Sequence, residues 1–371
     1  MAVKFSLSLE SAVNFPPPSI LANPKFRLNL LSIRNQLGNN NEHCIFTKNG
    51  RGALAIAGEA LKRDTENVIL VPAYHCPALV EPFIWLDYQI RFYPVTDNLS
   101  IDLEVLEECL SSNVVTHCIL VRYFGFNQNI EEVISALKQH NISIIEDCAH
   151  AFFAFQHKLQ TNSCRSDAQI CSINKLLPSI DGGGLHMPKH ALPELRPRGI
   201  MSEIKGILHT LGISQRLLKL KPSRATLPAK EDVKPASDVF RYFVPEEKYN
   251  ASYRHTKLMA QYSQLDEIAK IRRSNFEYIV SHIQNCSAGS PLYTKLTSEE
   301  VPYVLPFILN DASDFKKLRM LGIQALRWEE IAESTCVTSN TYREKLVQLP
   351  CHHQMSKCQM DKLIQSIKQL G

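Results

Sequence analysis

Short apolar segments alternate with helix-forming segments between residues 68 and 147, and this alternation restricts the fold more than any other feature. The expected strands are 68–71, 90–93, 118–123 and 142–145, and the expected helices are 78–86, 102–110 and 130–139. Strands that are apolar at nearly every position are usually buried on both faces. The pattern therefore predicts an α/β fold with a mostly parallel central sheet and helices on both of its faces.

Polar and aromatic side chains follow the carboxyl ends of these strands, where sheets of this kind bind their ligands. They are Tyr74, His75, Cys76, Tyr123, Phe124, Glu146, Asp147 and His150. Asp147 is the most informative of them, because a carboxylate at the end of a buried strand costs free energy unless it is paired. A helix N-cap and an ion pair with an arginine are the structural alternatives for this residue.

Lys175 lies in a segment that suits an amine able to react with a carbonyl group. It follows the hydroxyl of Ser172 and has apolar neighbours, which would lower its pKa and favour the uncharged, nucleophilic amine. The glycine run from Gly182 to Gly184 would let the backbone pass close to a flat ligand. The structural alternative is an ordinary solvated loop lysine.

A glycine-containing segment, Gly50, Arg51 and Gly52, precedes an expected helix at 53–61. A helix N-terminus presented by glycines offers free N–H groups and a positive dipole to a phosphate, although glycines also cap helices for structural reasons. Pyridoxal 5'-phosphate (PLP) needs an amine, an anion at its ring nitrogen, a group over its ring and a phosphate cup. The sequence supplies candidates for all four.

The length of 371 residues, of which 44% are hydrophobic, predicts one large and one smaller domain. We expect a proline-containing N-terminal arm at 1–24, a large cofactor-binding domain at 25–245 and a small α/β domain at 246–371. The arm should lie over the body of the protein or over a neighbour. In the small domain we expect helices near 266–283, 313–321 and 360–370 and a strand at 304–309.

Charge and cysteine usage limit the partners and the compartment. The net charge of +4 is too small to indicate a nucleic-acid partner, and eleven scattered cysteines without metal-ligand spacing predict reduced thiols, no metal site and a cytoplasmic location. The N-terminus has only Lys4 before a short stretch interrupted by Glu10, so no signal peptide is expected, and no apolar run reaches about 18 residues, so no membrane span is expected.

The segment 189–234 is basic and contains an amphipathic stretch at 200–220, in which Ile204, Ile207, Leu208, Leu211 and Leu218 can share one face. We expect this face to pack on its own protein, with a membrane surface or a partner as the alternatives. The positive charge of Arg196 and Arg198 could face a nucleotide diphosphate.

Over most of its length the chain resembles the DegT/DnrJ-type sugar aminotransferases, which are fold-type-I PLP enzymes. The resemblance rests on short motifs in family order: 50–54 (Gly-Arg-Gly-Ala-Leu), 71–76 (Val-Pro-Ala-Tyr-His-Cys), 123–125 (Tyr-Phe-Gly), 145–151 (Ile-Glu-Asp-Cys-Ala-His-Ala), 172–175 with 181–183, 272–275 (Arg-Arg-Ser-Asn), 321–323 (Leu-Gly-Ile) and 349–352 (Leu-Pro-Cys-His). None of these motifs is decisive alone, but their joint order over most of the chain is specific.

The resemblance implies a role for each matching position. Lys175 would bind the cofactor covalently and move the proton, and Asp147 would keep the pyridine nitrogen protonated. Ser172 and the backbone of Gly50, Arg51 and Gly52 would bind the phosphate. His150, where the family usually has glutamine, would lie near the ring hydroxyl, and its charge state would influence the cofactor.

Two further features of the family concern the ring face and the partner subunit. His75, or as the alternative Tyr74, would cover the ring, since the usual aromatic residue is replaced. The segment 252–256 resembles one that reaches into the partner's site, with Arg254 as a phosphate ligand and Ser252 in place of asparagine. The resemblance thus implies a homodimer with shared active sites.

The implied reaction is a ping-pong transfer of an amino group from an amino acid, glutamate or glutamine, to the keto group of a nucleotide-linked sugar in polysaccharide or secondary-metabolite synthesis. Family members that eliminate water can carry histidine in place of the lysine, so Lys175 favours transamination. An elimination or decarboxylation enzyme on the same scaffold, or a non-catalytic PLP-binding regulator, remains the alternative.

Overall fold

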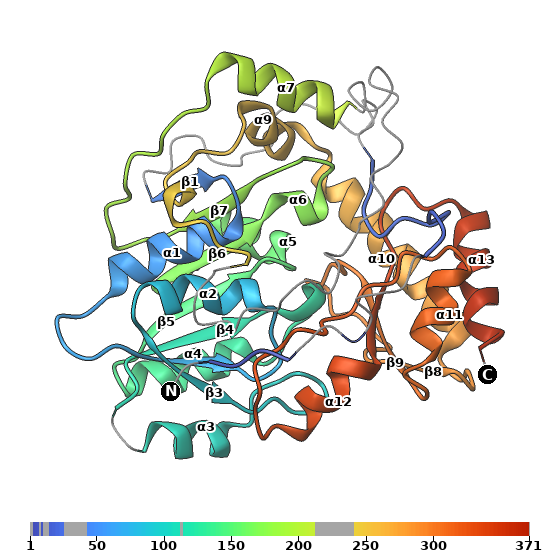
Figure 1. Ribbon diagram of the computed structural model, residues 1–371, viewed down its shortest axis with the longest axis horizontal. Coiled ribbons are helices and arrows are strands. Elements are labelled where there is room, and N and C mark those ends of the chain that lie inside the picture. The colour runs from blue at the N-terminus through green and yellow to red at the C-terminus, as the bar shows by residue number, and fades with distance from the viewer. Residues whose placement is uncertain are drawn as a thin grey trace.

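A central sheet of seven strands organises the larger part of the molecule within the residues that the computed structural model describes, which are 3–6, 9, 15–25, 43–111, 114–211 and 241–370 (Figure 1). Its order is β1-β7-β6-β5-β4-β2-β3. The strands are β1 (Cys44–Thr47), β2 (Val68–Pro72), β3 (Gln89–Tyr93), β4 (His117–Val121), β5 (Ser143–Cys148), β6 (Ala168–Ser172) and β7 (Gly183–His186). Strands β2 to β6 pair in parallel, and β7 runs antiparallel to both β1 and β6.

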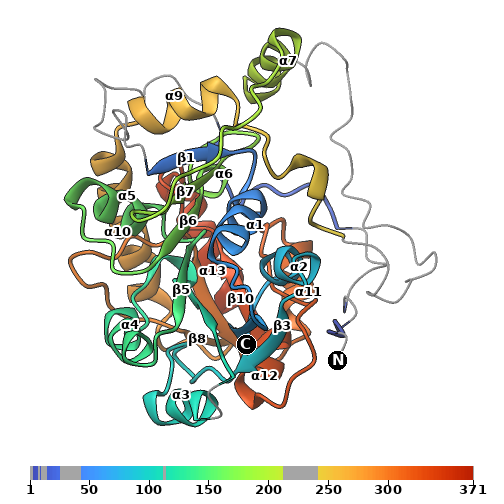
Figure 2. The same cartoon turned by 90° about the vertical axis from the view of Figure 1, so that its left-hand side faces the viewer.

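Helices cover both faces of this sheet, as the sequence predicts. On one face lie α1 (Gly50–Leu61) and α2 (Pro77–Trp85), and on the other lie α4 (Ile130–Gln139) and α5 (Phe152–Thr161) (Figure 2). Helix α3 (Leu103–Leu110) lies near β3, at the sheet edge. The spacing of Ile130, Val133, Ile134 and Leu137 places one apolar stripe of α4 on the sheet, and all four are buried. The α/β prediction is confirmed.

The strands end at different residues from those expected, and the differences shape the site. Strand β4 ends at Val121 rather than residue 123, because Tyr123–Gly125 forms a 3₁₀ turn in which Phe124 takes a left-handed φ of 58°. Strand β5 continues to Cys148 and so contains Asp147. Strand β6, which the sequence analysis did not predict, leads directly into α6 (Ile173–Leu176) and Lys175.

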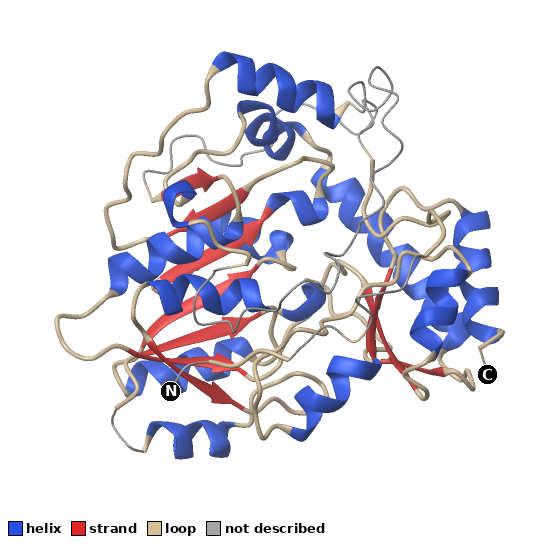
Figure 3. Ribbon diagram, viewed as in Figure 1, coloured by secondary structure: helices blue, strands red, loops and turns tan. Residues whose placement is uncertain are grey.

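A second, antiparallel sheet of three strands forms the core of the C-terminal part among the described residues, with the order β10-β9-β8 (Figure 3). Its strands are β8 (Gly289–Pro291), β9 (Leu305–Leu309) and β10 (Leu346–Leu349). The helices are α9 (Arg254–Tyr262), α10 (Leu265–Ile283), α11 (Asp314–Met320), α12 (Val337–Lys345) and α13 (Lys357–Lys368). Met259, Ala260, Leu265 and Ile268 share a core with α5, so the boundary after residue 245 stays a prediction.

The described arm residues contact the C-terminal part of the chain. Phe5 forms a β-bridge with Ala332, and Ile20 forms one with Ile323. None of the eleven cysteines, all of which lie in the described part, forms a disulfide. No helix in the described residues has the length and apolar content needed to cross a bilayer.

Candidate active site

A cavity of about 190 Å³ opens at the carboxyl ends of the central strands and brings together residues from six segments of the chain. Parallel strands end at one edge of a sheet, which is why residues far apart in sequence meet there. The lining residues are Asn49, Gly50, Arg51, Leu54, His75, Cys76, Ala78, Leu79, Val121, Asp147, Ala149, His150, Ile170, Ser172, Asn174, Lys175 and Trp328.

Lys175 reaches this cavity from α6, the single helical turn that follows β6. Burial lowers the pKa of its ammonium group, because the charged form loses its hydration, while Asp147 and Cys76 partly oppose the shift. The lysine is therefore easier to deprotonate than a solvated one. This environment suits an amine that attacks a carbonyl carbon.

Asp147 is the second-last residue of β5, and its side chain lines the same cavity. One of its oxygens accepts a hydrogen bond of 2.7 Å from the Ala149 N–H, and within the described residues no second donor is bound to the carboxylate. Burial raises the pKa of Asp147, and the nearby Lys175 only partly offsets this rise. A protonated ring nitrogen would supply the cationic partner that a buried carboxylate requires.

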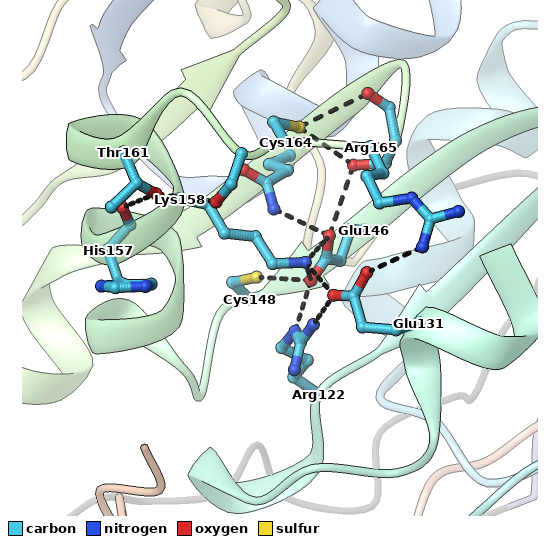
Figure 4. A network of polar contacts seen from close by, with 12 residues as sticks. Arg122, Glu131, Glu146, Cys148, His157, Lys158, Thr161, Cys164 and Arg165 are labelled. Carbon is cyan, nitrogen blue, oxygen red and sulfur yellow. Dashed lines mark hydrogen bonds and ion pairs between the residues drawn. The ribbon is translucent and has the colours of Figure 1, made fainter. Parts of the chain in front are cut away.

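Glu146, the residue before Asp147, points to the opposite face of the sheet because successive side chains of a strand alternate (Figure 4). The Glu146 side chain is fully buried and accepts a hydrogen bond from Arg122. Both of its oxygens lie 3.3 Å from Lys158 Nζ, and one of them accepts a hydrogen bond of 2.7 Å from Gln169 Nε2. The arginine therefore pairs with Glu146 rather than with Asp147. The ion-pair alternative for Asp147 does not hold, and its carboxylate is left for the cavity.

The N-terminus of α1 forms another part of the cavity wall through Gly50 and Arg51. The helix begins earlier than expected, at Gly50, with Asn49 as its N-cap, and the Asn49 side chain accepts from the Gly52 N–H at 3.0 Å. Gly52 itself does not line the cavity. The first N–H groups of a helix lack intrahelical partners, so those of Gly50 and Arg51 suit a phosphate.

Ser172 also lines the cavity, at the end of β6, and its hydroxyl donates to Asn174 Oδ1 at 2.8 Å. A hydroxyl in this position can turn to an anion while Asn174 remains beside it. Ser172 and the start of α1 lie on the same cavity, as a phosphate cup requires.

The glycine run is placed differently from the prediction, because Gly182 to Gly184 do not line the cavity. A Cβ at Gly183 would lie 2.4 Å from the Asn49 backbone, and one at Gly184 would lie 2.7 Å from Cys171 Sγ. The run therefore lets β7 pass close to the start of α1 and to β6. Its small size serves packing between protein segments rather than contact with a flat ligand.

The two candidates for the ring face are both held by other contacts. His75 lines the cavity, but its ring stacks on Phe92 at 5.2 Å and its Nδ1 lies 2.9 Å from the Pro72 carbonyl oxygen. Tyr74 is fully buried beside Trp328 and is not a lining residue. Cys76 lines the cavity next to His75, and the role of His75 and Tyr74 toward a cofactor stays a prediction.

His150 lines the cavity between two aromatic rings, with Phe124 at 5.4 Å and Tyr303 at 4.7 Å. Burial, with a smaller contribution from Lys175, holds the pKa of His150 well below its usual value, so the imidazole is neutral near pH 7. Its Nδ1 is buried and has no hydrogen-bond partner among the described residues. A ring hydroxyl of the cofactor would satisfy that atom, so the donor set fits PLP.

The segment around Ser252 and Arg254 does not line the cavity of its own chain. The Ser252 N–H donates to the Phe46 carbonyl at 2.9 Å, and Asp181 fixes the segment by accepting from the Thr256 hydroxyl at 2.7 Å. Arg254 is exposed. Arg198 Nη2 lies 3.5 Å from Asp181, and the role of Arg196 and Arg198 toward a nucleotide stays a prediction.

The amphipathic stretch at 200–220 falls partly on α7 (Ile200–Thr210), and residues 212–220 lie outside the described part of the chain. The described residues do not cover the apolar face as expected, since Ile204 is 47%, Ile207 41% and Leu211 42% exposed. Helix α7 instead rests on α9 through Gly206, where a Cβ would lie 2.9 Å from His255. The absence of a side chain at Gly206 allows this close contact.

Sequence reasoning missed several lining residues, of which Trp328 is the largest. The N-cap residue Asn49 could have been recognised, because asparagine before a helix start is a strong capping pattern. Trp328 follows the motif at 321–323 closely, but neither that motif nor any local pattern connects it to the cavity.

Comparison with known proteins agrees with this geometry. A model of the DegT/DnrJ/EryC1/StrS aminotransferase family matches residues 33–187. The aminotransferase TlmJ from Streptoalloteichus hindustanus has 14% identity and a TM-score of 0.62, covering 88% of this chain and 85% of that one. NtdA from Bacillus subtilis, solved with bound cofactor PMP, has 12% identity and a TM-score of 0.59 over 88% of this chain and 73% of that one.

The GDP-4-keto-6-deoxymannose-3-dehydratase ColD, with bound GDP-perosamine, has 14% identity and a TM-score of 0.59 over 88% of both chains. At such identities the three structures show that this chain shares their fold. The matched residues 33–187 contain every described lining residue of the cavity except Trp328, and over this stretch the chain is similar to the DegT/DnrJ/EryC1/StrS aminotransferases.

Proposed function

We propose that this protein is a PLP-dependent aminotransferase that transfers an amino group from glutamate or glutamine to the keto group of a nucleotide-linked sugar. The observation that carries the proposal is the meeting of Lys175 and Asp147 in one cavity, beside the N-terminus of α1. An amine, a carboxylate and a phosphate cup are the groups that PLP requires. The family match supports the aminotransferase reaction.

The cavity residues would have different roles in the proposed reaction. When bound, PLP supplies the electron sink that stabilises the carbanion of the reacting substrate carbon. Lys175 would hold the cofactor through its amine, and its Nζ would take up and return the proton of the reacting carbon. Asp147 would keep the ring nitrogen charged, while Ser172 and the N–H groups of Gly50 and Arg51 would hold the phosphate.

Both half-reactions would use the same catalytic residues, so the two substrates would react one after the other in a ping-pong order. In the first, the amino group leaves the amino acid, and in the second it arrives on the sugar keto group. The neighbour ColD, described with a bound nucleotide-linked amino sugar, supports an acceptor of this class. We place the reaction in polysaccharide or secondary-metabolite synthesis in the cytoplasm, where the unpaired cysteines would remain reduced.

A dehydratase is the second candidate, because ColD shares the fold. Product analysis distinguishes the two: an aminotransferase releases a 2-oxo acid from glutamate in proportion to amino sugar formed, whereas a dehydratase releases a deoxy-keto sugar. A non-catalytic PLP-binding protein would form neither. Lys175 and Asp147 in one cavity favour catalysis, because a binding protein needs no electron sink.

The test is an absorbance spectrum of the purified protein reconstituted with PLP, before and after glutamate. We expect the wild type to show a band near the visible edge that glutamate moves to the shorter wavelengths of the amine form. Lys175→Ala should lack the lysine-bound band, because no other cavity residue carries an amine.

Lys189→Ala is the matched control, since Lys189 is an exposed lysine outside the cavity, and its spectrum should equal that of the wild type. Borohydride reduction of the wild type followed by peptide mass spectrometry should place the cofactor on Lys175. A wild type that stays colourless with excess PLP, or a label on another lysine, would contradict the proposal.

A further inference from the structure

Trp328 is the only cavity-lining residue that comes from beyond residue 175 in the described part of the chain. It lies between α11 and α12, in the C-terminal part, and its ring packs on Tyr74 at 5.0 Å and on His150 at 5.4 Å. These contacts fix the indole against the larger part of the molecule. The cavity is therefore completed by one aromatic side chain from the C-terminal part.

These contacts leave part of the Trp328 ring accessible. Its neighbours Tyr74, Tyr123 and Phe124 are fully or almost fully buried, whereas Trp328 keeps part of its surface accessible and lines the cavity. No hydrogen bond from its indole N–H is found within the described residues. The side chain thus offers both an apolar face and a free donor to a bound molecule.

The residues expected to hold PLP do not include Trp328, so the accessible part of its ring is available to a second molecule in the cavity. That molecule is not recognised through its charge, because an indole is neutral and no carboxylate-binding arginine accompanies it on the C-terminal side of the cavity. An aromatic face with one N–H donor instead fits a ring that carries C–H bonds on one face and hydroxyl or keto oxygens at its edge. A sugar ring has this chemistry.

We propose that Trp328 is the residue that recognises the sugar ring of the acceptor, by stacking its indole on the ring and donating its N–H to a ring oxygen. The inference rests on the proposed aminotransferase function and adds a specificity-determining residue to it. Recognition by Trp328 belongs to the second half-reaction alone. The amino acid donor, whose recognition requires charge, does not depend on it.

A binding experiment tests this without turnover, because the chain has two tryptophans, Trp85 and Trp328. Trp85→Phe leaves Trp328 as the sole reporter, and Trp328→Phe leaves Trp85, which packs beside Phe243 away from the cavity. Each PLP-loaded variant is titrated with UDP-, dTDP- and GDP-linked 4-keto-6-deoxy sugars. We expect a saturable emission change for at least one sugar in Trp85→Phe and none in Trp328→Phe.

A kinetic experiment separates the two half-reactions. In Trp328→Ala, the rate of the spectral change with glutamate should stay within about twofold of the wild type. The KM for the sugar that binds should rise about tenfold, because the variant loses one aromatic contact with the sugar ring. Trp328→Phe should restore part of the affinity, because a phenyl ring keeps the face but lacks the donor.

Two results would overturn the assignment. One is an unchanged Trp328 emission with all three nucleotide-linked sugars, and the other is an equal loss of both half-reactions in Trp328→Ala and Trp328→Phe. These failures differ from a failure of the proposed function, which would show as a wild-type spectrum unaffected by glutamate, because the titration requires binding and no amino transfer.

Discussion

The chemistry of Asp147 depends on the few hydrogen-bond partners that its buried carboxylate has. Asp147 has one hydrogen bond and a pKa raised by burial, so a protonated ring nitrogen is the partner it needs to stay charged. Asn in its place has the same shape but no charge. We expect Asp147→Asn to keep the lysine-bound cofactor band and to slow the glutamate half-reaction roughly 100-fold or more, measured by stopped-flow absorbance.

Asp167→Asn is the control for this prediction, because Asp167 supports the other end of β5 by accepting from the Ile144 N–H at 2.8 Å. An asparagine oxygen can still accept that bond, so the half-reaction should keep its rate. If Asp147→Asn reacts as fast as Asp167→Asn, Asp147 does not act on the ring nitrogen.

At the scale of elements, the buried charges around Glu146 join β4, β5, β6, α4 and α5. Burial by itself would raise the pKa of Glu146, but Arg122 and Lys158 outweigh it and hold this pKa at about 2 instead of 4.5. A lowered pKa means that the folded state binds the proton less well than the unfolded state. The stabilisation is complete above about pH 5 and is lost as the pH falls through about 2.

We therefore expect Glu146→Gln to lower the free energy of unfolding at pH 7 by about 3 kcal/mol, measured by urea denaturation. The difference from the wild type should shrink as the pH falls from about 4.5 toward 2, because the wild-type carboxylate is then protonated as well. Glu131→Gln is the matched control. Because the Glu131 side chain in the same network is 43% exposed, this variant should lower the free energy of unfolding by no more than about 1 kcal/mol. A difference for Glu146→Gln that does not depend on pH would contradict the charge-based account.

The whole molecule carries an apolar surface on α7 and α9 that the described part of its own chain leaves uncovered. Helices α7 and α9 lie side by side (Figure 1), with a groove of about 250 Å³ lined by residues of both. Ile200, Met201, Ile204 and Ile207 are exposed on α7, and Leu258 is 51% exposed on α9. This surface lies beside Arg254, which does not enter the cavity of its own chain. We propose that a second copy of the chain covers it and that each Arg254 serves the partner's cavity.

We expect the wild type to sediment as a dimer and Ile204→Glu to sediment as a monomer, because a charge at the centre of an apolar contact opposes burial. Met320→Glu is the matched control, since Met320 is 59% exposed at the end of α11, away from this surface, and this variant should remain dimeric. A monomeric wild type, or a dimer that survives Ile204→Glu, would exclude this interface.

Local pattern was a good guide to the sheet and to its chemistry. The apolar segments at 68–71 and 142–145 became β2 and β5, and the periodic segment at 130–139 became α4 with the expected bounds. Lys175 and Asp147 were recognised because both the fold type and the motif order point to the carboxyl edge of the sheet. The ends of strands were less predictable, since a local turn such as the one at Phe124 stops β4 early.

The α/β rhythm, the residues at the strand ends and the family resemblance can be predicted from the chain alone, because they depend on patterns within a few neighbouring residues. The packing of Gly183 on Asn49, the pairing of Arg122 with Glu146 and the position of Trp328 at the cavity become visible in the folded molecule. Each of these contacts joins segments that are distant along the chain. Their pairing follows from how the layers pack, and no local pattern encodes it.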